Sequence, residues 1–220
     1  MILSFIGVLF LAYLIGSIPF GFIIVKVFSG KDILSVESGR TGGTNAMRAA
    51  GVWAGVATGV FDIIKGFSAV IVGRLLIPGS HVWVDVLAPI CAIIGHNYSA
   101  FLIQRTENGG LRFRGGAGGA TCLGGSIGLW FPSLFVILPL CWAIYYFGGF
   151  ASITTLSVAL LSALLFAYRA WLGLSPWQYS IYGLLAFCLM AWSLRPNIKR
   201  LIAGTERVVG LRAKKQRAAE

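Results

Sequence analysis

Five stretches of about 20 apolar residues run through this chain, and they limit the folds open to it more than any other feature. A helix needs about that length to cross a bilayer. Charged residues make up 11% of the sequence, whereas soluble domains carry about 25%. We therefore expect an all-α integral membrane protein with a single domain over residues 1–220. The expected spans are Met1–Val25, Gly51–Ile77, Trp83–Ile103, Gly149–Tyr168 and Ser175–Leu194.

The stretch from Gly119 to Phe147 is also apolar, but it contains Pro132 and Pro139 and is too long for one crossing and short for two. We expect either two short crossings or a re-entrant turn there. Positive residues collect in cytoplasmic loops, and the loop after the first span, the loop before Gly119 and the tail at 195–220 are all basic. Because these three segments are expected on the same side, the number of crossings between them has to be even. If this stretch makes two crossings, the chain has about seven helices, some short or broken, with the N-terminus outside and the C-terminus cytoplasmic.

The net charge of +11 is concentrated in these loops and in the basic tail. A basic end next to a span is typical of attraction to anionic lipid, and no groove-reading motif accompanies it, so we expect no nucleic-acid partner. The first 25 residues carry no charge, which favours a retained helix over a secretory signal. The four cysteines are typical of buried thiols, since all lie in apolar stretches: Cys91, Cys122, Cys141 and Cys188.

Two polar segments rich in glycine, hydroxyl groups and arginine interrupt the apolar chain. The first polar segment is Glu37–Arg48 (E-S-G-R-T-G-G-T-N-A-M-R), and the second is Arg112–Gly125 (R-F-R-G-G-A-G-G-A-T-C-L-G-G). Glycine lets successive N–H groups converge on one anion, arginine adds a charged fork, and a helix starting near Ala46 would add its dipole. Each segment alone is also typical of a flexible turn or of close helix packing. Together they predict a phosphate-handling site near the membrane surface.

Polar residues inside the apolar spans form a second group of candidates. Asp62 and Lys65 lie three residues apart on one helical face, which favours a structural ion pair. A lone histidine, His96, is more often a hydrogen-bonded structural residue than a catalytic one. The remaining charged residues are expected near the outer interface: Arg74, Asp85 and Arg169.

Short motifs follow one another along the chain in a definite order. They are G-S-I-P-F-G at Gly16–Gly21, the first polar segment, D-I-I-K-G at Asp62–Gly66, G-H at Gly95–His96, F-R-G-G-A-G-G-A-T at Phe113–Thr121 and N-I-K-R-L-I-A-G-T-E at Asn197–Glu206. In this order and spacing they resemble the bacterial acyl-phosphate:glycerol-3-phosphate acyltransferases, the PlsY family. The resemblance covers nearly the whole chain.

The resemblance implies a seven-helix enzyme of the bacterial cytoplasmic membrane with its site on the cytoplasmic side. Such an enzyme transfers a fatty acyl group from acyl phosphate to the 1-hydroxyl of glycerol 3-phosphate and gives lysophosphatidic acid for phospholipid synthesis. Acyl phosphate is already activated, so the protein has to supply orientation and charge stabilisation rather than a nucleophile. The family uses no cofactor and no metal, and no obligate protein partner is evident.

The resemblance also implies roles for individual residues. Ser38 and Arg48 match the key serine and arginine of the family and are expected to be catalytic. The residues expected to bind substrate or phosphate are Gly39, Gly43, Thr44, Asn45, His96, Arg114, Gly115, Gly116, Gly118, Thr121 and Asn197. The expected structural residues are Asp62, Lys65 and Glu206.

This chain departs from the family pattern at three positions. Ala117 occupies the place of a phosphate-binding lysine, Leu194 the place of a histidine, and Arg40 the place of an asparagine. A hydrogen bond to a charged group contributes roughly 1.5–3 kcal/mol, so loss of the lysine weakens phosphate binding unless Arg40 or Arg114 supplies the charge. Two alternatives stay open: a divergent relative with another acceptor or donor, and a non-catalytic membrane protein that binds a phosphorylated ligand or anionic lipid.

Overall fold

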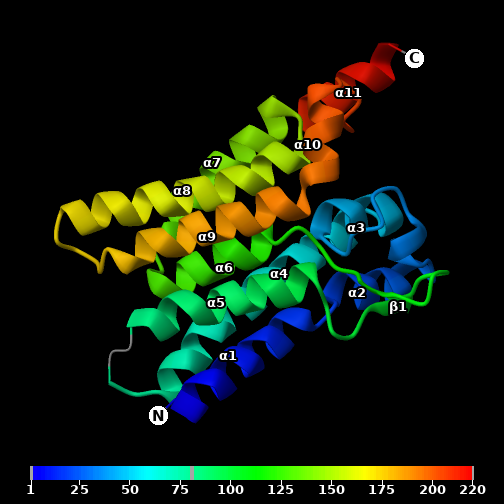
Figure 1. The fold of residues 1–220 in the computed structure, drawn as a ribbon. Coiled ribbons are helices and arrows are strands. Elements are labelled where there is room, and N and C mark those ends of the chain that lie inside the picture. Colours follow the sequence, from blue (N-terminus) through cyan, green and yellow to red (C-terminus); the bar gives the residue numbers. More distant parts are fainter. Residues whose placement is uncertain (1, 80–81, 220) are drawn as a thin grey trace.

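The computed structural model describes residues 2–79 and 82–219, and its main body is a bundle of long helices lying side by side (Figure 1). Around the centre of the bundle, α4 packs against α5 and α6, α1 packs against α5, and α8 packs against α9. The expectation of a helical protein is confirmed. The bundle helices are α1 (Ile2–Ser17), α4 (Val52–Leu76), α5 (Val82–Asn97), α6 (Gly119–Leu129), α7 (Ser133–Ala143), the π-helix η2 (Ile144–Gly148), α8 (Ala151–Trp171) and α9 (Gln178–Ser193).

Most of the shorter elements gather at one end of the bundle, which we call the polar end (Figure 1). A short antiparallel hairpin lies there, with Ile103 paired to Phe113 and Gln104 paired to Arg112. The last helix of the chain lies at this end, whereas the N-terminal helix begins at the other (Figure 1). The elements of the polar end are α2 (Phe20–Ser29), η1 (Ile33–Ser35), α3 (Gly43–Ala50), β1 (Ile103–Arg105), β2 (Leu111–Phe113), α10 (Arg195–Ile202) and α11 (Gly210–Ala219).

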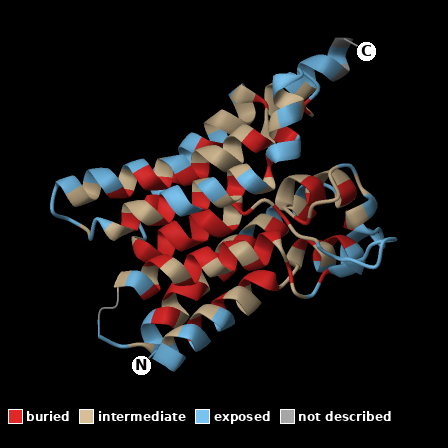
Figure 2. Ribbon diagram, in the orientation of Figure 1, coloured by how far each residue is buried: buried red, intermediate tan, exposed pale blue. Residues whose placement is uncertain are grey.

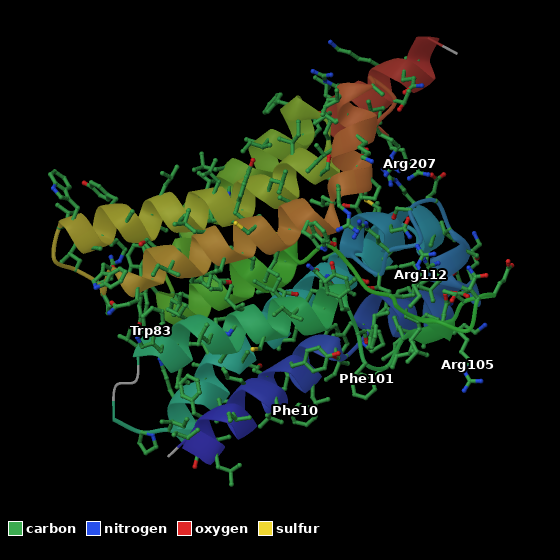
Figure 3. All side chains as sticks on the ribbon, in the orientation of Figure 1. Phe10, Trp83, Phe101, Arg105, Arg112 and Arg207 are labelled. Carbon is green, nitrogen blue, oxygen red and sulfur yellow. The ribbon has the colours of Figure 1, made fainter. Side chains whose placement is uncertain are left out.

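Apolar side chains fill the interior and also cover the outside of the bundle. Ile93, Phe166 and Tyr182 belong to the buried core between α5, α8 and α9, which Figure 2 shows as a buried centre with more exposed outer faces. Phe10 and Trp83 project outward (Figure 3), with exposed fractions of 61% and 45%. A soluble monomer rarely exposes so much apolar surface, whereas a bundle surrounded by lipid requires it.

Three helical segments in the described residues are long and apolar enough to cross a membrane: Ile2–Ser29, Val52–Leu76 and Ala151–Trp171. The pair α9–α10 is bent by 70° and gives a fourth candidate. The stretch 119–147 forms two short helices, α6 and α7, because Trp130 ends the first and the chain turns back at Pro132. The shorter apolar helices are Val82–Asn97, Gly119–Leu129 and Ser133–Gly148.

Some expected boundaries were wrong. The first span continues to Ser29 rather than ending at Val25, and its helix is interrupted at Ile18–Pro19 because proline has no N–H to continue the helix. The third ends at Asn97 rather than at Ile103, since the Ser99 N–H donates to the Arg114 carbonyl at 3.0 Å and leaves the helical pattern.

The helix expected near Ala46 starts earlier, at Gly43. The Gly42 carbonyl already accepts the N–H groups of Asn45 and Ala46, at 3.0 Å each. The first turn of α3 is therefore built from the glycine and threonine of the first polar segment.

The crossing of α1 and α5 depends on glycine. A Cβ atom on Gly16 would lie 2.1 Å from the Ala92 carbonyl oxygen, whereas one on Gly7 of the same helix would meet nothing within 4 Å. We expect Gly16→Ala to lower the free energy of unfolding by about 1–3 kcal/mol through overpacking. Gly7→Ala should be neutral or slightly stabilising, because alanine favours helix. Thermal unfolding in detergent measures both, and equal midpoints for the two variants would contradict the close crossing.

Candidate active site

The fold joins the two polar segments at the polar end of the bundle. The Thr41 N–H donates to the Gly115 carbonyl at 3.2 Å, and Arg40 Nη1 donates to the Gly116 carbonyl at 2.9 Å. Gly116 is held from its other side, because its N–H donates to the His96 carbonyl at 2.9 Å. Residues more than 70 positions apart in the sequence thus form one surface.

A cavity of about 230 Å³ opens at this junction. Four helices direct their N-terminal ends at it. They contribute Gly42–Asn45 from α3, Gly118–Ala120 from α6, Ala151 and Ser152 from α8, and Leu194 and Asn197 from α10. We call this space the reaction cavity.

Helix N-termini make the reaction cavity attractive to anions. The first N–H groups of a helix have no partner within the helix, and the aligned peptide dipoles add about half a positive charge there. Gly118 makes the approach of α6 possible, because its φ of +92° lies in the left-handed region that favours glycine. Such an arrangement binds phosphate through backbone donors alone.

Arginine adds full charge to the same space. Arg48 lies on α3 and lines the reaction cavity together with Ser38. In the part of the chain that the structure describes, Arg48 forms neither an ion pair nor a side-chain hydrogen bond. Its charge is therefore free to meet a bound anion.

Arg40 is fixed between the segments that contain Ala117 and Leu194, the other two positions where the resemblance implies a different residue. Its Nη1 donates to the Gly116 carbonyl and to Ser193 Oγ, at 2.9 Å each, and its Nη2 donates to the Ser193 carbonyl. Gly116 directly precedes Ala117, and Ser193 directly precedes Leu194. Burial lowers the pKa of Arg40, yet a guanidinium stays protonated at neutral pH. The cation of this wall of the cavity is therefore an arginine from the first polar segment.

Asn197 is held in place by Glu206. Its Nδ2 donates to Glu206 Oε1 at 2.9 Å, and Arg200 Nε binds the other carboxylate oxygen at 3.2 Å. The buried amide of Asn197 therefore faces the reaction cavity in one orientation, as a donor and acceptor for a polar ligand.

Asn45 holds the backbone of the loop before α3 in place. Its Nδ2 is within hydrogen-bond distance of three backbone carbonyls, those of Ile33, Val36 and Arg40, at 2.9–3.2 Å. This amide ties the loop before α3 to the helix and so positions Ser38 and Arg40.

A buried charged cluster forms the floor of the cavity. Lys65 Nζ lies 2.9 Å from Asp62 Oδ1 and donates to the Ile18 carbonyl at 3.2 Å, and His96 Nδ1 lies 3.5 Å from the same carboxylate oxygen. Asp62 and His96 line the reaction cavity. A Cβ atom on Gly116 would lie 2.0 Å from His96 Nε2, so this glycine allows the imidazole to pack directly under the second polar segment.

The residues expected from the sequence divide between two cavities. Ten of them line the reaction cavity: Ser38, Gly43, Thr44, Asn45, Arg48, Asp62, His96, Gly118, Asn197 and Glu206. Gly39, Arg114 and Gly115 instead line a neighbouring cavity. Lys65, Gly116 and Thr121 line neither; Thr121 is fully buried in α6, where Gly66 packs against its carbonyl.

Sequence reasoning missed several residues of the reaction cavity. Ser152 and Thr155 come from the first turns of α8, and Arg207 comes from the tail. The only feature of the sequence that could have indicated Ser152 and Thr155 is their spacing of three residues at the start of an apolar span. The other missed residues are Gly59 and Ala151.

Comparisons with known proteins agree with one another. A family described as glycerol-3-phosphate acyltransferase matches residues 6–204. Glycerol-3-phosphate acyltransferase 2 of Moorella thermoacetica is 36% identical over 205 residues, covering 93% of this chain and 97% of the relative. The glycerol-3-phosphate acyltransferase of Thermus thermophilus is 37% identical over 215 residues, covering 93% and 95%.

Solved structures give the same result. Crystal structures of PlsY, an integral membrane glycerol 3-phosphate acyltransferase, match in the glycerol 3-phosphate form with a TM-score of 0.77 at 28% identity, and in the lysophosphatidic acid form with a TM-score of 0.75 at 27% identity. Each covers 94% of this chain and 96% of the other.

Proposed function

This chain belongs to the glycerol-3-phosphate acyltransferase family, and from that premise we propose that its reaction cavity transfers a fatty acyl group from acyl phosphate to the 1-hydroxyl of glycerol 3-phosphate. The product is lysophosphatidic acid. The observation that carries the proposal is the convergence of four helix N-termini, Arg40 and Arg48 on one cavity. Both substrates carry phosphate, and this cavity is built to hold phosphate.

The reaction needs orientation and charge stabilisation from the protein. The hydroxyl oxygen of glycerol 3-phosphate attacks the acyl carbonyl carbon and forms the ester bond. The bond from that carbon to the phosphate oxygen then breaks, and orthophosphate leaves with the electron pair. The hydroxyl proton goes to the departing phosphate or to water. Backbone N–H groups and arginines that bind the phosphates hold the reacting atoms together and stabilise the charge that builds up.

We propose that the acyl chain reaches the reaction cavity from the lipid side of α4. Gly59 of α4 lines the reaction cavity, and a Cβ atom there would meet nothing within 4 Å. Val56 and Val60 of the same helix are about half exposed on its outer face, at 50% and 48%. α4 therefore presents one residue to the reaction cavity and its neighbours to the outer apolar face of the bundle.

We assign seven crossings to the apolar segments, counting α6 and α7 as one each, with the N-terminus outside and the C-terminus in the cytoplasm of a bacterial cell. Charge supports this orientation. Among the described residues, Arg74 and Arg169 are the basic residues at the end opposite the reaction cavity, whereas the loops around α2, the hairpin and α10 are strongly basic. Arg74 is paired there with Asp85 at 2.9 Å, and Arg169 stacks on Trp130.

Turnover in reconstituted membranes tests the proposal. The purified protein, placed in liposomes with palmitoyl phosphate and isotopically labelled glycerol 3-phosphate, should produce labelled lysophosphatidic acid and one equivalent of orthophosphate. Mass spectrometry identifies the lipid. Heat-denatured protein and palmitoyl-coenzyme A in place of the phosphate donor are the controls, and neither should give product.

Two results would favour the alternatives. A panel of polyol phosphates identifies a divergent relative if another acceptor is acylated faster than glycerol 3-phosphate. Saturable binding of glycerol 3-phosphate without turnover, under conditions where a lysine-containing relative is active, would contradict the enzyme and indicate a binding protein.

A further inference from the structure

A second, larger cavity of about 570 Å³ lies beside the reaction cavity, between the hairpin and the start of α10. Its most distinctive lining is six arginines against a single carboxylate, Glu37. We call it the arginine vestibule. The arginines come from the first polar segment, β2 and the chain after it, α10 and the tail: Arg40, Arg112, Arg114, Arg195, Arg200 and Arg207.

Four of these six arginines, Arg40 among them, have no carboxylate partner among the described residues. Arg200 is paired with Glu206 at 3.2 Å and Arg207 with Glu37 at 2.8 Å. Within the described residues, Arg112, Arg114 and Arg195 have no carboxylate within 4 Å. Arg195 instead lies on the Trp192 ring, 3.8 Å from its centroid, which holds the guanidinium at the rim.

Among the described residues, two side chains that line the vestibule have buried polar atoms without a hydrogen-bond partner. Arg114 Nε has no hydrogen-bond acceptor, and neither Nδ2 nor Oδ1 of Asn97 has a partner, although Asn97 is only 4% exposed. Burial lowers the pKa of Arg114, and the neighbouring Arg112 lowers it further. Buried polar groups usually have partners, so these unsatisfied donors point to a ligand with several acceptor atoms.

The vestibule and the reaction cavity share a wall. Ser38, Arg40, Asn197 and Arg207 line both. An anion bound in the vestibule is therefore one side chain away from the site of acyl transfer. The shape also favours a small ligand, because a protein partner needs about 800 Å² of surface per side rather than a cavity.

We propose that the arginine vestibule is a second anion site, which binds a phosphate-bearing molecule beside the reaction cavity. The role of this site rests on the proposed function. The reaction consumes glycerol 3-phosphate from the aqueous phase and releases orthophosphate, and both molecules have to pass the polar end. Arginine recognises phosphate through paired N–H donors. A site of this kind raises the local concentration of the soluble substrate. Its loss should therefore raise the KM for glycerol 3-phosphate and weaken the salt dependence of kcat/KM.

The kinetic test uses Arg112→Gln with Arg195→Gln, because both side chains are exposed and neither has a structural ion pair. We expect KM for glycerol 3-phosphate to rise about tenfold, which corresponds to about 1.4 kcal/mol, with kcat and the KM for acyl phosphate unchanged. The salt dependence of kcat/KM should become weaker. Arg105→Gln is the matched control, because Arg105 is exposed on the hairpin, lies outside the vestibule and points away from it (Figure 3).

Equilibrium binding separates this inference from the proposed function. Calorimetric titration of the purified protein with glycerol 3-phosphate should show two equivalents in the wild type and one in the double variant. One equivalent in both proteins, with unchanged KM, overturns the vestibule and leaves the reaction cavity intact. No binding in either protein overturns both proposals.

The titration also identifies the source of the phosphate. It is repeated in nanodiscs of phosphatidylcholine with and without phosphatidic acid. If the vestibule binds a lipid headgroup, the second equivalent of glycerol 3-phosphate should disappear when phosphatidic acid is present. If it binds soluble phosphate, the second equivalent should remain.

Discussion

Replacing Arg48 with glutamine is expected to lower kcat/KM for lysophosphatidic acid formation about 10²–10³-fold, the effect seen when a single preorganised donor is removed from an active site. Arg48 lies on α3 and lines the reaction cavity. Its guanidinium has no carboxylate partner among the described residues, so its charge is available to the substrate phosphates.

The fold should survive this change. Because Arg48 makes no side-chain hydrogen bond in the described part of the chain, the midpoint of thermal unfolding should stay within a few degrees of the wild-type value. Lys31→Gln removes the same charge from an exposed position of the polar end and should leave kcat/KM unchanged. An Arg48→Gln variant with at least one third of the wild-type activity would contradict a catalytic role for this residue.

Replacing Arg40 with glutamine is expected to lower kcat/KM about 100-fold, and adding Ala117→Lys should restore part of the loss. Arg40 presents its charge between Gly116 and Ser193, next to the positions where relatives are expected to carry lysine and histidine. A charge-assisted hydrogen bond contributes about 1.5–3 kcal/mol, or about a 10- to 100-fold change in binding. Ala117 lines the same cavity, so a lysine there reaches the same space.

The rescue separates two explanations for the loss. If Arg40 supplies the cation, Arg40→Gln with Ala117→Lys should recover about tenfold relative to Arg40→Gln alone. If Arg40 only ties the two polar segments together, the lysine has no effect, because it does not replace the bonds to Gly116 and Ser193. Arg40→Lys should be less active than wild type, since a lysine cannot form the same pair of parallel bonds.

Hydropathy predicted most of the helical segments because an apolar run is a local property of the sequence. It was wrong where tertiary contacts decide the end of a helix. Trp83–Ile103 was expected as one span, but the chain leaves the helix after Asn97 to pair with the second polar segment. The break at Pro19 was visible in the sequence, yet the apolar run continues through it.

The two polar segments indicated the candidate site because arginines and clustered glycines interrupt an otherwise apolar sequence there. The rest of the site is not local. Ser152 begins an ordinary apolar helix, and only the folded bundle places the start of α8 beside α3, α6 and α10. Thr121 shows the opposite error, since a residue inside the second polar segment lies fully buried in α6 and lines neither cavity.

The central proposal is that this cavity carries out acyl transfer with Arg40 in place of the lysine that the resemblance places at position 117. The most direct measurement is the initial rate of lysophosphatidic acid formation from acyl phosphate and glycerol 3-phosphate by the wild type beside Ala117→Lys, in the same liposomes. We expect the wild type to turn over at a rate within about tenfold of the lysine variant, because a single charge-assisted contact changes binding by about that factor or somewhat more. An inactive wild type beside an active Ala117→Lys would show that Arg40 does not supply the missing charge.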